Sequence, residues 1–199
     1  MKDFDNYYDQ DVRVRTLMDT GKYVVFYQVL SSLVNIEGQF GELGVYKGGS
    51  ARFFARIAED FGKEVYLFDT FNGIESGMLG DNDVAVQGPN MREGEFKHEL
   101  SNVEVVKEFL SDLPVHIFQG RFPQSASDVD EQFVFVHLDA DMYASTLAGL
   151  EWFYERLVPG GVIVLDDYTL PSCPGVKTAL DEFGRPYEKI STYQAIVRT

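Results

Sequence analysis

Short apolar runs alternate with amphipathic segments from about residue 39 to the end of the chain. Brief apolar runs bounded by turn residues are typical of buried strands, and apolar positions three or four residues apart are typical of helices. The pattern predicts strands at 39–45, 64–69, 115–119, 133–139, 162–165, 187–191 and 193–198. It predicts helices at 48–61, 103–110, 142–157 and 176–183, the third of them ended by Pro159-Gly160-Gly161.

The order of these elements predicts the fold class. Strand–helix–strand repeats form right-handed crossovers in a parallel sheet, and the nearly all-apolar run 133–139 is typical of a central strand that is covered on both faces. The last two strands have almost no connection between them, so we expect an antiparallel hairpin at the sheet edge. The sequence therefore predicts one α/β domain over residues 1–199 with a mostly parallel, seven-stranded sheet.

Two segments lie outside this alternation. Residues 1–37 contain an apolar helix, roughly Lys22 to Leu33, which we expect either to cover the sheet or to contact a second copy of the chain in a homo-oligomer. Residues 72–101 are polar and rich in glycine, and they are too long for an ordinary connection inside a compact domain. This segment is therefore expected to be either a mobile lid or disordered.

Composition limits the classes of partner. The formal net charge is −15 and the pI is near 4.5, which argues against nucleic acid and against anionic membranes, because both are bound through Lys and Arg. There is no apolar run of the ~20 residues that a membrane span needs, and the first residues lack the plan of a signal peptide. Cys173 is the single cysteine. These features together predict a cytoplasmic protein that acts on a small molecule.

A glycine-rich turn follows the first predicted strand, in the segment from Gly41 to Ser50. Glycines at this place let the backbone turn tightly and approach a ligand closely. The turn lacks the Gly-x-Gly-x-x-Gly spacing of dinucleotide sites, and Glu42 stands two residues before Gly44, where it would repel a pyrophosphate. Asp69 ends the second strand, where a carboxylate accepts hydrogen bonds from ribose hydroxyls. The pair indicates S-adenosylmethionine, although a helix-capping turn with ordinary surface carboxylates remains the alternative.

Carboxylates gather at the ends of two central strands. Asp139 ends one of them and Asp166-Asp167 end the next, with Asp141 just beyond Asp139. Ligands of open α/β sheets bind at this edge, and all-oxygen donors suit Mg²⁺. The alternative is that aspartates at strand ends cap helices, as Asp141 would do for the helix near residue 142.

Four ordered motifs carry a resemblance to a known family. They are the segments 42–50 (ELGVYKGGS), 68–73 (FDTFNG), 137–146 (HLDADMYAST) and 159–168 (PGGVIVLDDY). Together they resemble the macrocin O-methyltransferase family, whose members have a Rossmann-like class I methyltransferase fold. These enzymes use S-adenosylmethionine and Mg²⁺ to methylate sugar hydroxyls of antibiotics. The glycine turn also resembles that of catechol O-methyltransferases, which share the fold and a metal.

The resemblance implies roles for particular residues. The metal would be held by Asp139, Asp166 and Asp167. The cofactor would be contacted by Glu42, Gly44, Tyr46, Gly48, Ser50 and Asp69, with Gly120, Arg121 and Phe122 near the adenine. The lysine base of catechol-type enzymes is missing, because Met142 occupies the comparable stretch.

The resulting hypothesis is Mg-assisted O-methylation of a sugar or glycosylated small molecule, with Asp139 accepting the hydroxyl proton. His137 is interpreted as a hydrogen-bonded core residue that shares the strand face of Asp139, and Cys173 as a thiol near the site that is not a ligand. Three alternatives stay open. They are methylation of a catechol-like phenol, a glycosyltransferase that uses Asp139-Ala140-Asp141 as an Asp-x-Asp motif, and an inactive protein that only senses an adenosine ligand.

Overall fold

The computed structural model describes all residues from Met1 to Thr199. The helices are α1 (Gln10–Val14), α2 (Thr20–Ser32), α3 (Gly49–Phe61), α4 (Val103–Phe109), α5 (Tyr143–Tyr154) and α6 (Pro174–Phe183). The strands are β1 (Gln39–Leu43), β2 (Val65–Asp69), β3 (Val115–Gln119), β4 (Phe133–Leu138), β5 (Leu157–Leu165), β6 (Tyr187–Lys189) and β7 (Ala195–Arg198). None of the helices has the length and apolar character that a membrane span requires.

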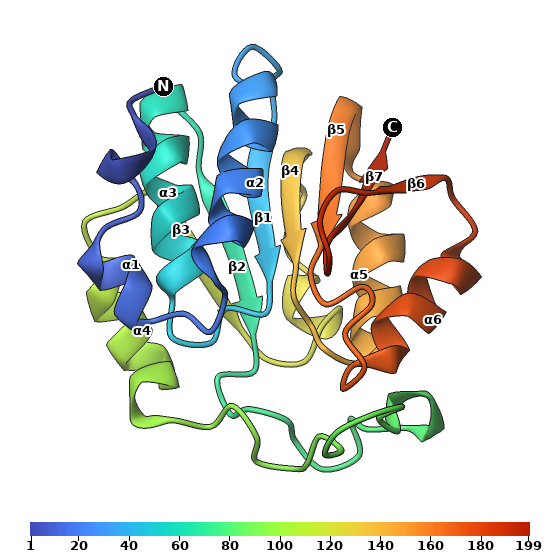
Figure 1. Cartoon of the computed structure of the whole chain (residues 1–199). Helices are drawn as coiled ribbons and strands as arrows, with labels where there is room; N and C mark the ends of the chain where they lie inside the picture. Colours follow the sequence, from blue (N-terminus) through green and yellow to red (C-terminus); the bar gives the residue numbers. More distant parts are fainter.

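The strands form one seven-stranded sheet in the order β3-β2-β1-β4-β5-β7-β6. The first five strands are parallel, and β7 runs antiparallel to both β5 and β6. The predicted fold class and the edge hairpin are therefore confirmed. The carboxyl ends of the parallel strands all point to one edge, at the bottom of Figure 1.

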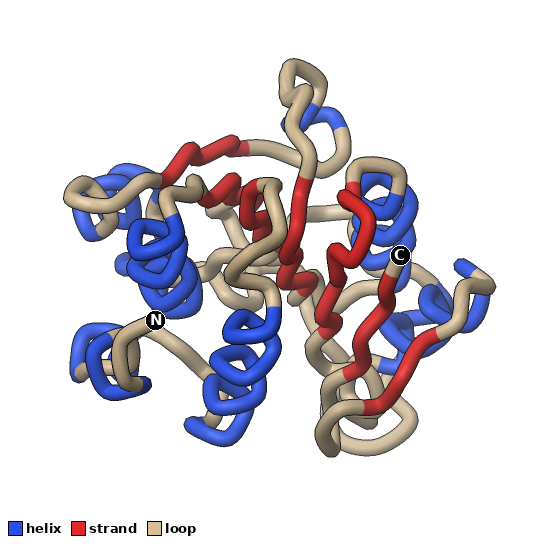
Figure 2. The backbone as a smooth tube through the Cα atoms, turned by 90° about the horizontal axis from the view of Figure 1, so that it is seen from above, coloured by secondary structure: helices blue, strands red, loops and turns tan.

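Helices cover both faces of the sheet (Figure 2). From Phe135 onward, the side chains of β4 enter two different hydrophobic clusters, because successive residues of a strand point to opposite faces. Phe135 packs with α2 and α3, whereas Val136 and Leu138 pack with α5 and α6. This two-sided burial explains the almost uninterrupted apolar sequence of β4.

The N-terminal segment covers the sheet, one of the two roles expected for it. Tyr23, Phe26 and Leu30 of α2 are fully buried. The ring centroid of Phe26 lies 5.1 Å from that of Phe54 on α3 and 6.3 Å from that of Phe135 on β4. The preceding short helix α1 was not predicted from the sequence.

The boundary between α5 and β5 differs from the prediction. The helix ends at Tyr154 rather than at residue 157, and the segment Pro159-Gly160-Gly161 lies within β5 instead of stopping the helix. The pairing of β4 with β5 is irregular here, because Phe133 pairs with Leu157 whereas Phe135 pairs with Val162. The extra residues form a bulge, and Gly160 adopts the positive φ of 81° that such an excursion needs.

Residues 72–101 run across the carboxyl edge of the sheet (green in Figure 1). The segment contains two 3₁₀ turns, Asp81–Asp83 and Glu99–Ser101. The buried Asp83 accepts a hydrogen bond from the Tyr143 backbone N–H at 2.7 Å and so caps α5. Asp141 was the predicted alternative cap, and the structure gives this role to Asp83 instead. The segment is thus attached to the domain at its middle, whereas its mobility stays a prediction.

Candidate functional site

A cavity of about 610 Å³ opens at the carboxyl edge of the sheet. Its wall combines the ends of β1, β2, β4 and β5 with the segment 15–22 and with parts of the loop 72–101. The strand order reverses between β1 and β4, which is the place where open α/β sheets bind ligands. The cavity is also of the size that holds small molecules and cofactors.

The glycine turn after β1 lies directly against the end of β4. Gly44 has a φ of 93°, and a Cβ atom built there would lie 1.9 Å from the carbonyl oxygen of Asp139. The Asp139 backbone N–H donates to the Leu43 carbonyl at 2.8 Å. Only glycine permits this approach, so the predicted cofactor turn and the predicted metal edge are neighbours.

Asp69, at the end of β2, fixes the shape of this turn. Its Oδ2 accepts hydrogen bonds from the backbone N–H groups of Val45 at 2.7 Å and Tyr46 at 2.9 Å. Its Oδ1 accepts from the Phe71 N–H at 2.8 Å. The carboxylate lines the cavity, and a carboxylate has about four acceptor positions. Asp69 therefore retains capacity to accept a bond from a ligand hydroxyl.

Backbone strain is concentrated around the cavity. All non-glycine residues with positive φ belong to its wall, and they are Tyr46, Phe71, Phe96, Asp141 and Asp167. Such conformations are uncommon outside glycine and cost roughly 1–3 kcal/mol each. Strained residues cluster at binding and catalytic sites, so their placement independently marks this cavity as functional.

The predicted cofactor residues divide into two groups. The cavity wall includes Gly44, Tyr46, Ser50, Asp69, Gly120 and Phe122. Three others point elsewhere. Glu42 is fully buried behind the turn. Gly48 is the N-cap of α3 and lies beside Val106. Arg121 donates to Glu75 Oε2 at 2.8 Å and so holds the loop 72–101. The expectation of direct cofactor contact is therefore kept only for the first group.

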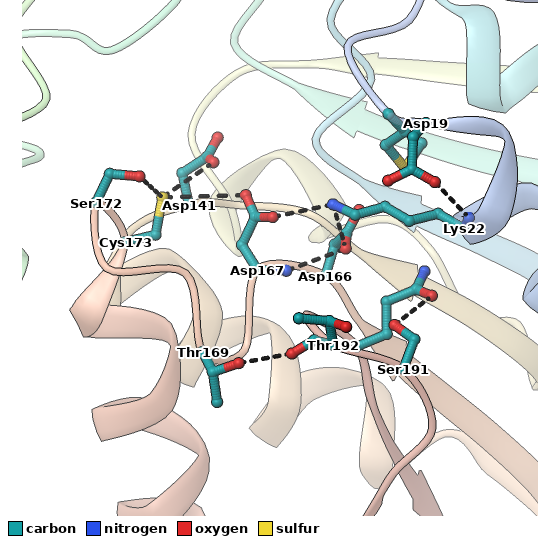
Figure 3. A network of polar contacts seen from close by, with 12 residues as sticks. Asp19, Lys22, Asp141, Asp166, Asp167, Thr169, Ser172, Cys173, Ser191 and Thr192 are labelled. Atoms are coloured by element: carbon teal, nitrogen blue, oxygen red, sulfur yellow. Dashed lines mark hydrogen bonds and ion pairs between the residues drawn. The ribbon is translucent and has the colours of Figure 1, made fainter. Parts of the chain in front are cut away.

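An acidic cluster occupies the next part of the wall. Asp139 follows β4, and Asp166 and Asp167 follow β5. A lysine that the sequence did not single out reaches this cluster from α2. Lys22 Nζ lies 2.7 Å from Asp166 Oδ1 and 3.1 Å from Asp167 Oδ1 (Figure 3). Its ammonium is the only cation in contact with these carboxylates.

Crowding and burial perturb the cluster strongly. Burial, together with the charges of Asp166, Asp141 and Asp167, raises the pKa of Asp139 well above its usual range. Burial and the charge of Asp167 also raise the pKa values of Asp141 and Asp166. Burial lowers the pKa of Lys22, but the nearby carboxylates outweigh it and raise the pKa above its usual value. These raised pKa values reflect the cost of keeping several buried carboxylates charged beside one lysine, a cost that a bound cation would relieve.

Asp167 also belongs to a second group at the far side of the cluster. The Cys173 thiol lies 3.7 Å from Asp141 Oδ1 and 4.0 Å from Asp167 Oδ2, and Figure 3 shows the three side chains together. Burial, followed by the charges of these carboxylates, raises the pKa of Cys173. The raised pKa disfavours the thiolate, which is the form that binds metals, and the interpretation of Cys173 as a non-ligand stays a prediction.

A polar pair lies in the core behind the cluster. His137 Nδ1 is 2.9 Å from Glu42 Oε1, and both side chains are fully buried. The two residues are register partners on β4 and β1. His137 is thus a hydrogen-bonded core residue, as the sequence suggested. Its partner was not predicted, because pairing between neighbouring strands depends on a register that one sequence does not give.

Comparison with known proteins places this geometry in a family. The pattern described as macrocin-O-methyltransferase (TylF) matches residues 24–195. Demethyldecarbamoylnovobiocin O-methyltransferase of Streptomyces niveus is 28% identical over 165 residues, which are 77% of this chain and 61% of that protein. Mycinamicin III 3''-O-methyltransferase of Micromonospora griseorubida is 28% identical over 149 residues, or 69% of this chain and 58% of the relative. The chain thus spans only about three fifths of these curated relatives.

Solved structures share the fold. The calicheamicin methyltransferase CalS11 superposes with a TM-score of 0.72 at 18% identity, covering 97% of this chain and 91% of that one. The O-methyltransferase NovP gives a TM-score of 0.71 at 21% identity, covering 92% and 81%. The Rossmann-like class I methyltransferase fold is therefore confirmed. Because the family pattern extends over most of the sequence, the chain belongs to the macrocin O-methyltransferase family.

Proposed function

We propose that the protein is an S-adenosylmethionine-dependent O-methyltransferase that methylates a hydroxyl group of a sugar or glycosylated small molecule. The observation that carries this proposal is the contact between Gly44 and Asp139, which joins a glycine turn and an acidic cluster within one cavity. Methyl transfer needs the donor and the acceptor oxygen side by side. The arrangement suits a donor over the glycine turn and an acceptor at the aspartates.

The donor half of the cavity fits a cationic nucleoside without phosphate. Ser50, Tyr46 and Asp69 line it, with Gly120 and Phe122 on the side where β3 ends. The carboxylates of the wall favour a positively charged sulfonium. The basic residues of the wall are Arg15 and Lys22. Lys22 is paired with aspartates, and Arg15 Nη1 donates to the Lys47 carbonyl at 3.3 Å. Two basic side chains, one of them already paired with aspartates, are few for holding a diphosphate.

The acidic half fits a divalent ion, Mg²⁺, held by Asp139, Asp166 and Asp167. Asp166 Oδ2 is buried and has no hydrogen-bond partner, and a bound cation would satisfy it. When bound, the ion would lower the pKa of an acceptor hydroxyl and offset the charge of the cluster. Asp139 lies at the cavity wall beside the glycine turn. In this proposal its carboxylate would accept the hydroxyl proton as general base.

The acceptor is proposed from the relatives and from the remaining wall. The names of the relatives describe O-methylation of demethyldecarbamoylnovobiocin, of a rhamnosyl-tetracenomycin C at the 4' position and of mycinamicin III at the 3'' position. The loop 72–101 contributes Met78, Met91 and Phe96 to the wall, and the N-terminal segment contributes Leu17 and Met18. These apolar side chains suit the body of a glycoside and exclude water from the reacting oxygen. A phenol would fit the same wall, so phenol methylation is kept as the second candidate.

The family match argues against the glycosyltransferase alternative. The inactive-sensor alternative differs from the proposal only in turnover.

The test is a turnover assay with S-adenosylmethionine, Mg²⁺ and a panel of glycosides and phenols, in which release of S-adenosylhomocysteine is measured. Asp139→Asn is expected to lower kcat at least ~100-fold, the usual contribution of a general base. The exposed Asp130→Asn is the matched control and should change it less than twofold. Asp139→Asn activity within a few-fold of wild type would exclude the proposed role. Binding of the cofactor without turnover on any acceptor would favour the sensor alternative.

A further inference from the structure

The histidine behind the acidic cluster has no role in the reaction proposed above. His137 lies inside β4 with its ring 4.8 Å from that of Phe26 and 5.3 Å from that of Phe54, measured between centroids. Its Nδ1 is bonded to Glu42 Oε1 at 2.9 Å. A buried charged or polar pair costs desolvation energy, and an apolar pair would pack here at least as well. The pair therefore calls for an explanation beyond packing.

Two buried atoms of this region lack hydrogen-bond partners. His137 Nε2 makes no hydrogen bond, and neither does Asp166 Oδ2. Both side chains are at least 99% buried, since His137 is 0% and Asp166 1% exposed. Leaving a buried polar atom unpaired costs roughly 1–3 kcal/mol. Such atoms in a folded protein commonly indicate an ion or water that completes them.

The same two residues belong to a group with the spacing of a metal site. One potential ligand atom each of His137, Asp139 and Asp166 lies within 4.8 Å of the other two. Ligands at about 2.1 Å from an ion can be separated by up to about twice that distance. The three side chains are therefore close enough for rotamer adjustments to bring their ligand atoms around one ion. Asp139 is the partly exposed member and lines the cavity.

We propose that His137, Asp139 and Asp166 form a nitrogen–oxygen site, which binds a first-row ion such as Mn²⁺ or Co²⁺ in preference to Mg²⁺. Imidazole suits such ions, whereas Mg²⁺ favours oxygen donors. Glu42 is the positioning residue, because a ligating histidine commonly donates its other N–H to a carboxylate that fixes the ring. This inference rests on the proposed function for the use of an ion at the acidic cluster. It keeps Asp139 and Asp166 as ligands, replaces Asp167 by the nitrogen ligand His137, and replaces Mg²⁺ by a first-row ion as the preferred metal.

The direct test is electron spin-echo spectroscopy of Mn²⁺ bound to the full chain. Wild-type protein is expected to show ¹⁴N modulation from one imidazole, and labelling with ¹⁵N-histidine should change the modulation frequency. This readout requires no variant and no turnover. Bound Mn²⁺ without histidine modulation would overturn the inference and leave the proposed function standing. Failure to bind any divalent ion would overturn both the inference and the metal part of the proposed function.

Variants test the metal preference. His137→Gln is expected to abolish the modulation and to lower the ratio of Co²⁺ to Mg²⁺ affinity at least tenfold, measured by calorimetry. Glu42→Gln should weaken Co²⁺ binding about 10–100-fold, as removal of such orienting groups does. The matched control is His116→Gln. His116 lies on β3, is exposed and pairs with Glu64, so this variant should change neither the modulation nor the affinity ratio. An unchanged affinity ratio in folded His137→Gln would contradict the site.

Discussion

Lys22→Met removes the cation that the acidic cluster holds. Lys22 Nζ contacts Asp166 Oδ1 at 2.7 Å and Asp167 Oδ1 at 3.1 Å, and the exposed fractions of the Lys22 and Asp166 side chains are 14% and 1%. Methionine is similar in length and apolar, so the aliphatic contacts of the side chain are largely kept. The variant therefore isolates the loss of the ammonium from the loss of packing.

The expected cost follows from burial. Removing one partner of a buried ion pair destabilises a protein by about 3–5 kcal/mol, because the other charge is left uncompensated. The pKa of Asp166 is already raised by burial and by Asp167, so proton uptake relieves part of this cost. We expect a loss of ~3 kcal/mol near pH 8. At about 2–4 °C per kcal/mol for a chain of this size, Tm should fall by roughly 6–12 °C.

The assay is urea unfolding at pH 8 in the presence of a chelator, for Lys22→Met, Asp166→Asn and the double variant. A coupling free energy of about 1–3 kcal/mol is expected, because the two side chains are in direct contact. Added Mn²⁺ should stabilise Lys22→Met more than wild type, since the ion no longer competes with an ammonium. Lys107→Met, which alters an exposed pair with Glu104, is the control and should change stability by less than ~0.5 kcal/mol. Additive single effects, or a loss below that value for Lys22→Met, would refute the reasoning.

Three further predictions follow from the site. Asp139 and Asp141 have raised pKa values in the folded chain, mainly through burial, whereas unfolded aspartates titrate near about 3.9. The folded chain thus binds more protons than the unfolded one, so its free energy of unfolding should fall as pH rises from about 5.5 to 8 in the presence of a chelator. The fall should be less steep with Mg²⁺. A flat or rising profile in urea unfolding would contradict this prediction. Gly44→Ala places a Cβ 1.9 Å from the Asp139 carbonyl oxygen. It should lower the free energy of unfolding by more than ~3 kcal/mol or prevent folding, as monitored by circular dichroism. Unfolding like that of wild type would show that the turn has room for a Cβ atom. Cys173 is buried and has a raised pKa. It should therefore react with iodoacetamide at pH 8 at least tenfold more slowly in the folded chain than in the urea-unfolded chain. Equal rates would show that the thiol is exposed to solvent.

Periodicity predicted the sheet because each parallel strand is buried on both faces. The run 133–139 matches β4 to within one residue, and the strand at 115–119 is reproduced without change. The segment 157–161 was missed because a bulge in β5 contains Pro159 and Gly160, residues that ordinarily end regular structure. Local propensity cannot show that a neighbouring strand holds such a segment in the sheet.

The site was predictable where its residues follow strand ends. Asp69, Asp139 and Asp166 were found in this way, because the carboxyl ends of parallel strands meet at one edge. Lys22 and Asp83 were not found, since their contacts with Asp166 and with the Tyr143 N–H join segments that are far apart in the chain. Neither residue carries a local signal, and only the packing of the N-terminal segment and of the loop 72–101 brings them to the cavity.

The central claim is that a methyl donor and a divalent ion lie side by side in one cavity. The most direct measurement is a crystal structure of the full chain with S-adenosylhomocysteine and Mn²⁺, in which anomalous scattering locates the ion. The account predicts the ligand along the glycine turn beside Gly44 and Asp69, and an anomalous peak at Asp139 and Asp166 in the same cavity. A ligand bound elsewhere, or an acidic cluster without a peak and still closed by Lys22 at saturating Mn²⁺, would contradict it.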